Sequence, residues 1–318
     1  MRYLHLNGRK TPVSQIALGS TYFGTAIAET TAWNMLDHFV ALGGTTIDTA
    51  RHYGQRISTD PSPSEQLIGS WLKINGMHQH MVLIGKGLYP EPTGKSRFSY
   101  ANLLYDIERS MDELHTDTFD IWFFHRDDPR IPVDEIMDMV APLVQSGVIQ
   151  TLGASNWTVQ RIAAANAYAE AHHLPQIQAS EIQWSLAKST PESWQDPTLV
   201  CMTEEELSWY QSHEMAVFAF SSQAKGFFSK AIAKEPLNTK SQQRFGFPEN
   251  YGRIERVAQL SEELNCSPAA ITVSYITSQK PDSVAIIGPS SISQLEDSLT
   301  DSNLVLSNEQ IAFLEGRI

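Results

Sequence analysis

Three apolar runs, each followed by a polar residue, decide the fold of this chain. They are Gly44-Thr45-Thr46-Ile47 before Asp48, Met81-Val82-Leu83-Ile84-Gly85 before Lys86, and Phe119-Asp120-Ile121-Trp122-Phe123-Phe124 before His125. Runs of this length and apolar content are typical of buried strands. Parallel strands bring their carboxyl ends to one edge of a sheet, so Asp48, Lys86 and His125 should meet there, joined by Tyr53. A carboxylate, an ammonium, an imidazole and a phenol gathered at one edge can transfer protons, which predicts an enzyme.

The same rhythm continues on both sides of these runs. Further strand-like segments lie near residues 15–19, 148–154, 176–181, 215–220 and 283–287, and helix-like segments near 31–42, 64–75, 99–114, 133–146, 158–171, 202–213 and 253–264. Eight strands that alternate with helices, without a linker, predict one (β/α)8 TIM barrel domain over residues 1–318. A doubly wound open sheet is the alternative, but residues 19–24 lack the Gly-rich fingerprint that usually follows its first strand.

Two segments fall outside this rhythm. Tyr3-Leu4-His5-Leu6 followed by Asn7-Gly8 predicts an N-terminal β-hairpin, because Asn-Gly is the strongest short hairpin signal. Residues 221–250, after the seventh strand, show no sustained period and predict a long loop that covers the site. Its basic residues, in an otherwise acidic chain, favour an anion as the group covered. They are Lys225, Lys230, Lys234, Lys240 and Arg244.

Composition narrows the function further. A net charge of −13 argues against nucleic acid as a partner, because phosphate contacts need a basic face. Two distant cysteines, Cys201 and Cys266, fit a reducing compartment. No apolar run approaches a membrane span and no apolar signal core opens the chain, so a cytoplasmic protein is expected, as a monomer or weak homo-oligomer. The pairs His78/His80 and His172/His173 lack further ligands at metal-site spacing, so no metal is expected.

Five motifs, in order, resemble the aldo-keto reductase family over nearly the whole chain. They are Ile47-Asp48-Thr49-Ala50-Arg51-His52-Tyr53-Gly54, the strand ending in Lys86, Phe124-His125-Arg126, Gly153-Ala154-Ser155-Asn156-Trp157 and Ile286-Ile287-Gly288-Pro289-Ser290. The resemblance implies an NAD(P)H-dependent oxidoreductase that acts on CH–OH groups. Such an enzyme reduces aldehydes and ketones to alcohols by hydride transfer from nicotinamide.

Carbonyl reduction also needs a proton on oxygen, and the four polar residues can supply it. Tyr53 is the general acid of this scheme. A free tyrosine has a pKa of about 10, and a nearby ammonium is expected to lower it. Lys86 would have that effect, Asp48 would hold Lys86 charged, and His125 would orient the substrate oxygen.

The resemblance also implies a cofactor surface. Ser155 and Asn156 would bind the nicotinamide carboxamide, together with Glu181, which stands where many relatives carry Gln. Phe220 would stack on the nicotinamide ring. The full set of expected cofactor-binding residues is Ser20, Thr21, Asp48, Ser155, Asn156, Glu181, Phe220, Ser221, Gln223, Lys225, Gly226, Gly288, Ser290, Ser291 and Gln294.

The adenosine end departs from relatives that prefer NADPH. Those relatives place Arg or Lys there for the 2′-phosphate, whereas residues 281–310 contain neither. The family implies NADPH, and this local chemistry leaves NADH open. The expected substrate is a small aldehyde, ketone or alcohol. It would contact Tyr53 and His125, and Tyr22 and Trp184 are expected to form the pocket wall.

Two other functions fit the same sequence. Some members of the family serve as cofactor-binding regulatory subunits of membrane channels, and slow turnover with tight cofactor binding would favour that role. A barrel lyase or isomerase acting on a sugar phosphate would bind no nicotinamide at all. Dinucleotide binding therefore separates the second alternative from the first.

Overall fold

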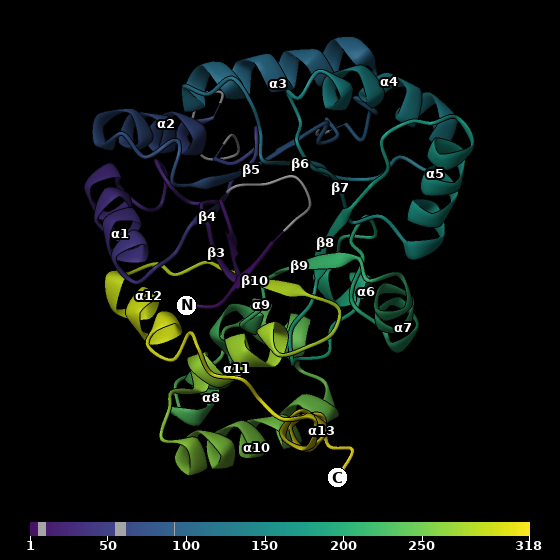
Figure 1. The fold of residues 1–318 in the computed structure, drawn as a ribbon. Coiled ribbons are helices and arrows are strands. Elements are labelled where there is room, and N and C mark those ends of the chain that lie inside the picture. The colour runs from purple at the N-terminus through teal and green to yellow at the C-terminus, as the bar shows by residue number, and fades with distance from the viewer. Residues whose placement is uncertain (6–10, 55–61, 92) are drawn as a thin grey trace.

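A closed barrel of eight parallel strands forms the centre of the molecule, as a computed structural model of residues 1–5, 11–54, 62–91 and 93–318 describes it. The strand order is β10-β3-β4-β5-β6-β7-β8-β9, seen along the barrel axis in Figure 1. The predicted (β/α)8 barrel is confirmed. The strands are β3 Ile16–Gly19, β4 Thr46–Asp48, β5 Val82–Gly87, β6 Ile121–Phe124, β7 Leu152–Ser155, β8 Ala179–Gln183, β9 Ala216–Phe220 and β10 Ser283–Ile287.

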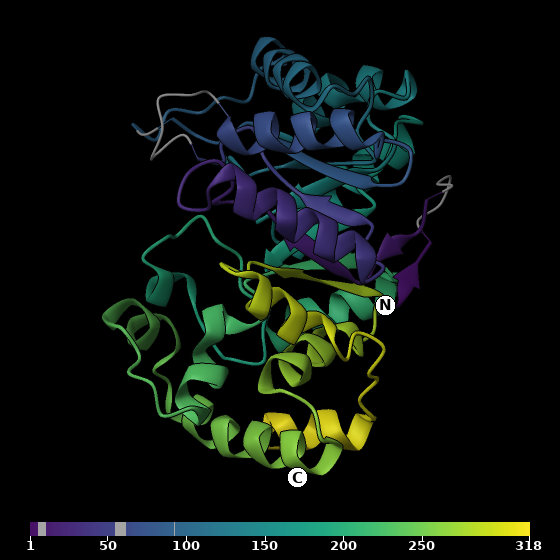
Figure 2. The same cartoon turned by 90° about the vertical axis from the view of Figure 1, so that its left-hand side faces the viewer.

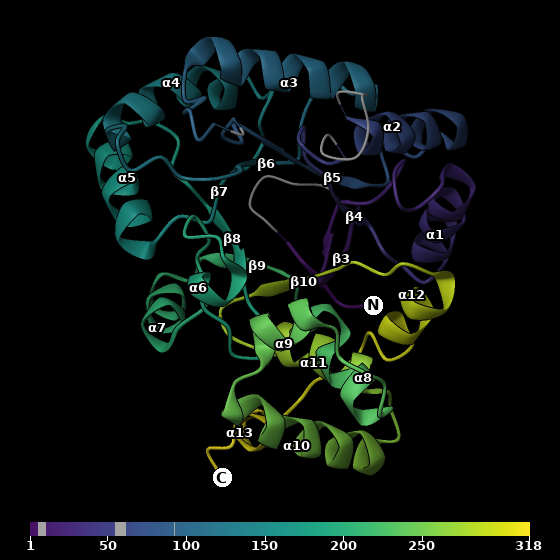
Figure 3. The same cartoon turned by 180° about the vertical axis from the view of Figure 1, so that it is seen from behind.

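Helices surround the barrel on all sides, and Figure 3 shows the same ring from behind. The predicted helices are confirmed to within a few residues at each end. Their bounds, with those of the remaining helices, are α1 Glu29–Ala41, α2 Pro63–Asn75, α3 Tyr100–Leu114, α4 Val133–Gln145, α5 Val159–Ala171, α6 Pro191–Trp194, α7 Glu204–His213, α10 Pro248–Leu264, α11 Pro268–Thr277, α12 Ile292–Leu299 and α13 Asn308–Glu315. Within the described ranges, none of the helices has the length and apolarity that crossing a membrane requires.

The N-terminal hairpin closes one end of the barrel. Strands β1 Tyr3–Leu4 and β2 Val13–Ser14 pair antiparallel, as predicted, while the expected Asn7-Gly8 turn lies outside the described residues. Leu4 and Val13 belong to the same apolar cluster as the inward residues of the barrel strands. In Figure 2 the purple hairpin lies at the right of the barrel, and the green helices that follow β9 lie at the lower left.

The segment after β9 is not the irregular loop that its sequence predicts. It folds into a 3-10 turn η1 Ala224–Gly226, helix α8 Phe227–Ile232 and helix α9 Thr239–Phe245 before α10 begins. These helices are too short to show an apolar period. They are held instead by buried aromatic rings, with Phe227 and Phe245 centroids 5.8 Å apart. The segment is long, and it is structured.

Candidate active site

Alternate residues of each barrel strand point inward, and this period positions the ionisable groups. Val82 and Ile84 belong to the apolar interior, so Lys86 points inward at the end of β5. Glu181 follows Ala179 inward on β8 in the same way. Lys86 is 0% exposed and Glu181 3%, so both charges lie inside the barrel and need partners there.

Tyr53 reaches the same place from the turn after β4. Gly54 takes a φ of +82°, in the left-handed region that glycine adopts at least cost. Arg51 anchors this turn, because its buried guanidinium contacts Glu65 at 3.0 Å and Glu113 at 2.8 Å. The turn that carries Tyr53 is thereby tied to α2 and α3.

The four predicted catalytic residues, here called the tetrad, lie together at the carboxyl end of the barrel. The Lys86 ammonium contacts a carboxylate oxygen of Asp48 and donates to the Tyr53 hydroxyl at 3.2 Å. The Tyr53 hydroxyl donates to the other Asp48 oxygen at 3.2 Å. The His125 ring meets the Tyr53 ring edge-on, with centroids 5.9 Å apart.

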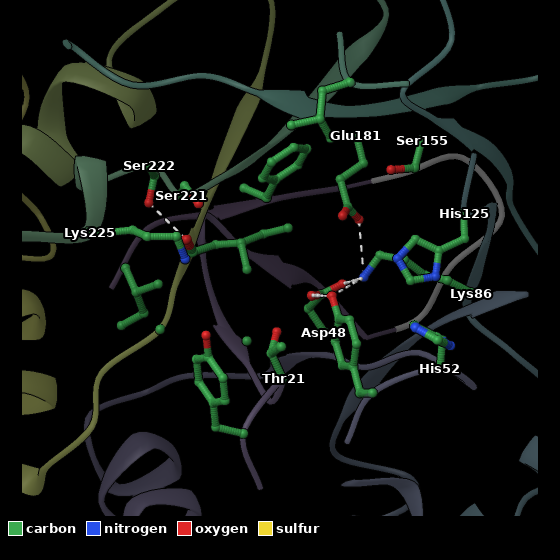
Figure 4. A pocket seen from close by; sticks show the side chains of 18 of the residues that line it. Thr21, Asp48, His52, Lys86, His125, Ser155, Glu181, Ser221, Ser222 and Lys225 are labelled. Carbon is green, nitrogen blue, oxygen red and sulfur yellow. Dashed lines mark hydrogen bonds and ion pairs between the residues drawn. The ribbon is translucent and has the colours of Figure 1, made fainter. Parts of the chain in front are cut away.

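A second carboxylate shares the same ammonium. Glu181 Oε2 lies 3.3 Å from Lys86 Nζ, so Lys86 stands between Asp48 and Glu181, as Figure 4 shows. Burial lowers the pKa of Lys86, but the two carboxylates outweigh burial and raise it above its ordinary value. Lys86 is therefore held in its charged form.

The pKa of Tyr53 differs from the expectation. Burial raises it, the Asp48 carboxylate adds to the rise, and the Lys86 ammonium opposes both without cancelling them. Lys86 therefore acts in the predicted direction, but burial is the largest contribution, and burial together with the Asp48 carboxylate leaves the pKa raised. In this environment the phenol keeps its proton, which is the form that a general acid needs.

The tetrad lines a cavity of about 1780 Å³. Most of the residues expected to bind cofactor or substrate line the same cavity, and Figure 4 shows several of them around it. They are Thr21, Tyr22, Ser155, Asn156, Glu181, Phe220, Ser221, Gln223, Lys225, Gly226, Gly288, Ser290 and Gln294.

Backbone strain is found where two of these strands end. Asn156 directly follows β7 with a φ of 59°, and Ser221 directly follows β9 with a φ of 53°. Non-glycine residues in this region cost on the order of 1–3 kcal/mol each, and they gather at functional sites. The Asn156 strain is offset by contacts on both sides, since its N–H donates to the Glu181 carbonyl at 2.9 Å and its side chain accepts from Val200 N–H at 3.2 Å.

The far part of the cavity is basic, and Lys225, Lys230 and Arg244 define this basic end. The Arg244 guanidinium lies over the Trp194 ring at 4.3 Å, and Lys225 Nζ lies 6.0 Å from the same ring. Surrounding protein and the Arg244 charge lower the pKa of Lys225, although its side chain faces the open cavity. In the part of the chain that the structure describes, none of the three forms an ion pair.

Three residues expected at the site do not line the cavity. The Ser20 hydroxyl donates to the Asp48 carbonyl at 2.9 Å and accepts from the Ser64 hydroxyl. Ser20 therefore stabilises the end of β4 and does not line the cavity. Ser291 caps α12 by accepting from Gln294 N–H at 3.3 Å. Trp184 is 3% exposed and packs in the core. Burial of a large aromatic ring stabilises the fold, and here the ring does not form a wall of the cavity.

Other residues form the wall that Trp184 was expected to form. The His52 and Tyr89 rings stack with centroids 4.0 Å apart, and Tyr89 meets His125 edge-on at 4.9 Å. The Arg126 guanidinium lies 5.2 Å from the Tyr89 centroid. All of these residues line the cavity beside the tetrad. His52, Tyr89 and Arg126 lie within a few residues of Tyr53, Lys86 and His125 in the sequence, and this closeness could have indicated that they line the same site.

Comparison with known proteins assigns this chain to a family. Residues 15–317 match the model of the aldo/keto reductase family. An uncharacterized oxidoreductase of Bacillus subtilis (strain 168), YrpG, is 25% identical over 99% of this chain and 95% of its own length. The norsolorinic acid reductase stcV of Emericella nidulans is 26% identical over 96% of this chain and 78% of its own, and the aldo-keto reductase str7 of Strobilurus tenacellus is 26% identical over 94% and 87%. Because the family match spans nearly the whole barrel, this chain is an oxidoreductase that belongs to the aldo/keto reductase family.

Proposed function

We propose that the protein reduces aldehydes and ketones to alcohols with NADPH, and that Tyr53 is the general acid. The observation that carries the proposal is the position of the Tyr53 hydroxyl, which lies 3.2 Å from both the Lys86 ammonium and an Asp48 oxygen at the wall of the cavity. A phenol held protonated beside a fixed cation can lose its proton to a carbonyl oxygen and leave a phenolate that the cation stabilises.

The residues of the cavity fit a dinucleotide. Ser155 and Asn156 provide hydrogen-bonding groups beside the tetrad, and Phe220 provides a flat ring. At the other end, Lys225 and Arg244 repel one another, and a pyrophosphate or phosphate between them would remove that cost. A Cβ added at Gly288 would meet no atom within 4 Å, so the backbone there leaves room for a ligand to approach.

Each residue of the tetrad has one role in this mechanism. The bound nicotinamide supplies the hydride. Tyr53 gives its proton to the carbonyl oxygen, and Lys86 stabilises the phenolate that remains. Asp48 keeps Lys86 charged and in place. The His125 ring packs against Tyr53, from where it can hydrogen-bond the substrate oxygen and orient it.

The basic end supports NADPH over NADH. The turn after β10 carries no cation, and the Ser290 hydroxyl and Gln294 side chain bond to each other at 2.9 Å. Arg244 and Lys225 come from the segment after β9 and line the same cavity. A guanidinium that stacks on Trp194 and has no carboxylate partner in the described residues is well suited to a 2′-phosphate.

The variant Tyr53→Phe tests the role of Tyr53. Turnover of an aromatic aldehyde should fall by about 10²–10⁴-fold, because the proton donor is lost. Affinity for NADPH should stay within a few-fold of wild type, since the hydroxyl acts in the transition state. Fluorescence titration measures the affinity, and loss of cofactor absorbance measures turnover.

Tyr105→Phe is the matched control. Tyr105 lines the same cavity outside the tetrad and is 53% exposed, so removing its hydroxyl should leave turnover close to wild type. If Tyr53→Phe turned over as fast as Tyr105→Phe, the proton would come from another group and the assignment would be wrong.

A further inference from the structure

Glu181 carries a buried carboxyl group that the proton-transfer scheme does not use. Its side chain points into the cavity from the middle of β8 and is almost fully buried. Lys86 Nζ lies 3.3 Å from Oε2, and among the described residues this oxygen accepts no hydrogen bond. A carboxylate with so little compensation is costly to bury unless another cation completes its environment.

The cations near Glu181 are already paired with other carboxylates, so an ionised Glu181 would have no cation of its own. Asp48 at the end of β4 contacts Lys86 more closely than Glu181 does. Tyr53 and His125 are its other titratable neighbours in the cavity wall. Arg126, after β6, attracts Glu181 but pairs with Asp196 at 3.5 Å. Ser155 and Asn156 on the β7 side, and Phe220 and Ser221 on the β9 side, carry no charge.

These surroundings hold a proton on Glu181 near neutral pH. Burial raises the pKa of its carboxyl to about 8, the Asp48 charge adds to the rise, and Lys86 and Arg126 oppose it. The side chain is therefore mostly a neutral acid at pH 7 and becomes a carboxylate above its pKa. A glutamine at the same place would stay neutral at every pH.

We propose that the Glu181 carboxylate makes this site select the oxidised, positively charged nicotinamide over the reduced one, and increasingly so as the pH rises. The inference rests on the proposed function, because it needs a nicotinamide beside Ser155, Asn156 and Glu181. The oxidised ring carries a positive charge that the reduced ring lacks, while both forms carry the same phosphates. The ratio of their affinities therefore reports the charge near the ring, and phosphate contacts cancel.

The size of the effect follows from Coulomb's law. Two opposite charges about 6 Å apart at an effective dielectric constant of about 20 favour the oxidised cofactor by about tenfold to hundredfold. The positive oxidised ring also favours the ionised form of Glu181. When the oxidised cofactor binds at a pH below the Glu181 pKa, Glu181 therefore releases a proton, whereas binding of the reduced cofactor releases none. As the pH rises, the site would thus increasingly favour the oxidised cofactor, which is the form that alcohol oxidation starts from.

Titration of the full-length protein with NADP⁺ and with NADPH between about pH 6 and about pH 9 tests this inference. In wild type, the affinity ratio of oxidised to reduced cofactor should rise by at least about tenfold across that range. In Glu181→Gln most of this rise should be lost, because the glutamine stays neutral across the whole range. Calorimetry in two buffers of different ionisation enthalpy should detect proton release on NADP⁺ binding by wild type alone.

Glu206→Gln is the matched control. Burial raises the pKa of the Glu206 carboxyl to about 7, so it titrates in the same range. Glu206 lies on α7 and is not among the residues that line the cavity. Its removal should leave the pH dependence of the affinity ratio unchanged.

The outcomes separate this inference from the proposed function. Failure of both dinucleotides to bind would overturn both. Binding of both with the same pH dependence in wild type and Glu181→Gln would overturn the role of Glu181 and leave the reductase standing. If Glu181→Gln did not fold, the wild-type protein would still decide, because a ratio independent of pH and no proton release would contradict the proposal.

Discussion

The two ends of the cavity carry ionisable groups in opposite proportions. At the tetrad, one ammonium, Lys86, is shared by the carboxyl groups of Asp48 and Glu181. At the basic end, Lys225, Lys230 and Arg244 form no ion pair within the described residues, and Arg244 rests on the Trp194 ring instead. One end is nearly neutralised by the protein itself, while the other is left to be neutralised by a ligand.

This difference separates two tasks of the cavity. The tetrad must keep its geometry before any ligand arrives, because proton transfer depends on hydrogen-bonding distances. A basic surface without partners costs stability in the free protein, and a bound anion recovers that cost as affinity. Removing the Lys86 charge should therefore mainly lower stability, whereas removing the Arg244 charge should mainly lower affinity for the cofactor.

The largest effect is expected at Lys86. Lys86→Met leaves Asp48 and Glu181 buried without their cation, and breaking a buried pair in this way costs about 3–5 kcal/mol of unfolding free energy. Chemical denaturation at neutral pH measures the loss.

Lys188→Met is the control for that loss. Lys188 pairs with Glu249, and both side chains are about half exposed, at 47% and 48%. An exposed pair contributes about 0–1 kcal/mol, so this variant should unfold almost as wild type does. Equal losses in Lys86→Met and Lys188→Met would show that the buried network does not stabilise the fold.

Arg244→Ala probes the basic end. Losing a charge-assisted contact to a phosphate costs about 1.5–3 kcal/mol, so NADPH affinity should fall by about tenfold to hundredfold. Stability without ligand should fall less than in Lys86→Met, because Arg244 forms no ion pair with any of the described residues. Fluorescence titration and thermal unfolding measure the two quantities.

Lys240→Ala on the same helix is the comparison for Arg244→Ala, because Lys240 is not among the residues that line the cavity. It should bind NADPH as wild type does. A larger loss of affinity in Lys240→Ala than in Arg244→Ala would mean that the phosphates bind elsewhere.

The smallest effect is expected at Ser290. Ser290→Arg places a guanidinium at the exposed turn after β10, where residues 281–310 contain no cation. If the 2′-phosphate lies near this turn, the affinity ratio of NADPH to NADH should rise by about a few-fold to tenfold. Parallel titration measures that ratio. An unchanged ratio would assign the 2′-phosphate to Arg244 and Lys225 alone.

The barrel and the tetrad could be predicted because they depend on local patterns. Each strand is a short apolar run, and the period of two within a strand carries Lys86 inward once Val82 and Ile84 are buried. The polar residue after each run then lies at the carboxyl edge by the rules of parallel sheets. No knowledge of side-chain contacts was needed for these steps.

The remaining parts depend on contacts between distant segments. Whether Trp184 or Tyr89 walls the pocket is decided by core packing around each ring, which no local pattern records. The short helices after β9 are too short for a visible period and are held by aromatic contacts such as Phe227 with Phe245. The net rise of the Tyr53 pKa likewise depends on burial and on carboxylates from separate strands.

The proposed carbonyl reduction is tested by parallel fluorescence titrations with NADPH and NADH, followed by an absorbance assay with a nitrobenzaldehyde. We expect saturable binding of NADPH, weaker binding of NADH, and oxidation of the bound cofactor when the aldehyde is added. Binding without oxidation would contradict the reductase and favour a cofactor-binding regulatory role. No binding of either dinucleotide would contradict both the reductase and the cofactor-binding role.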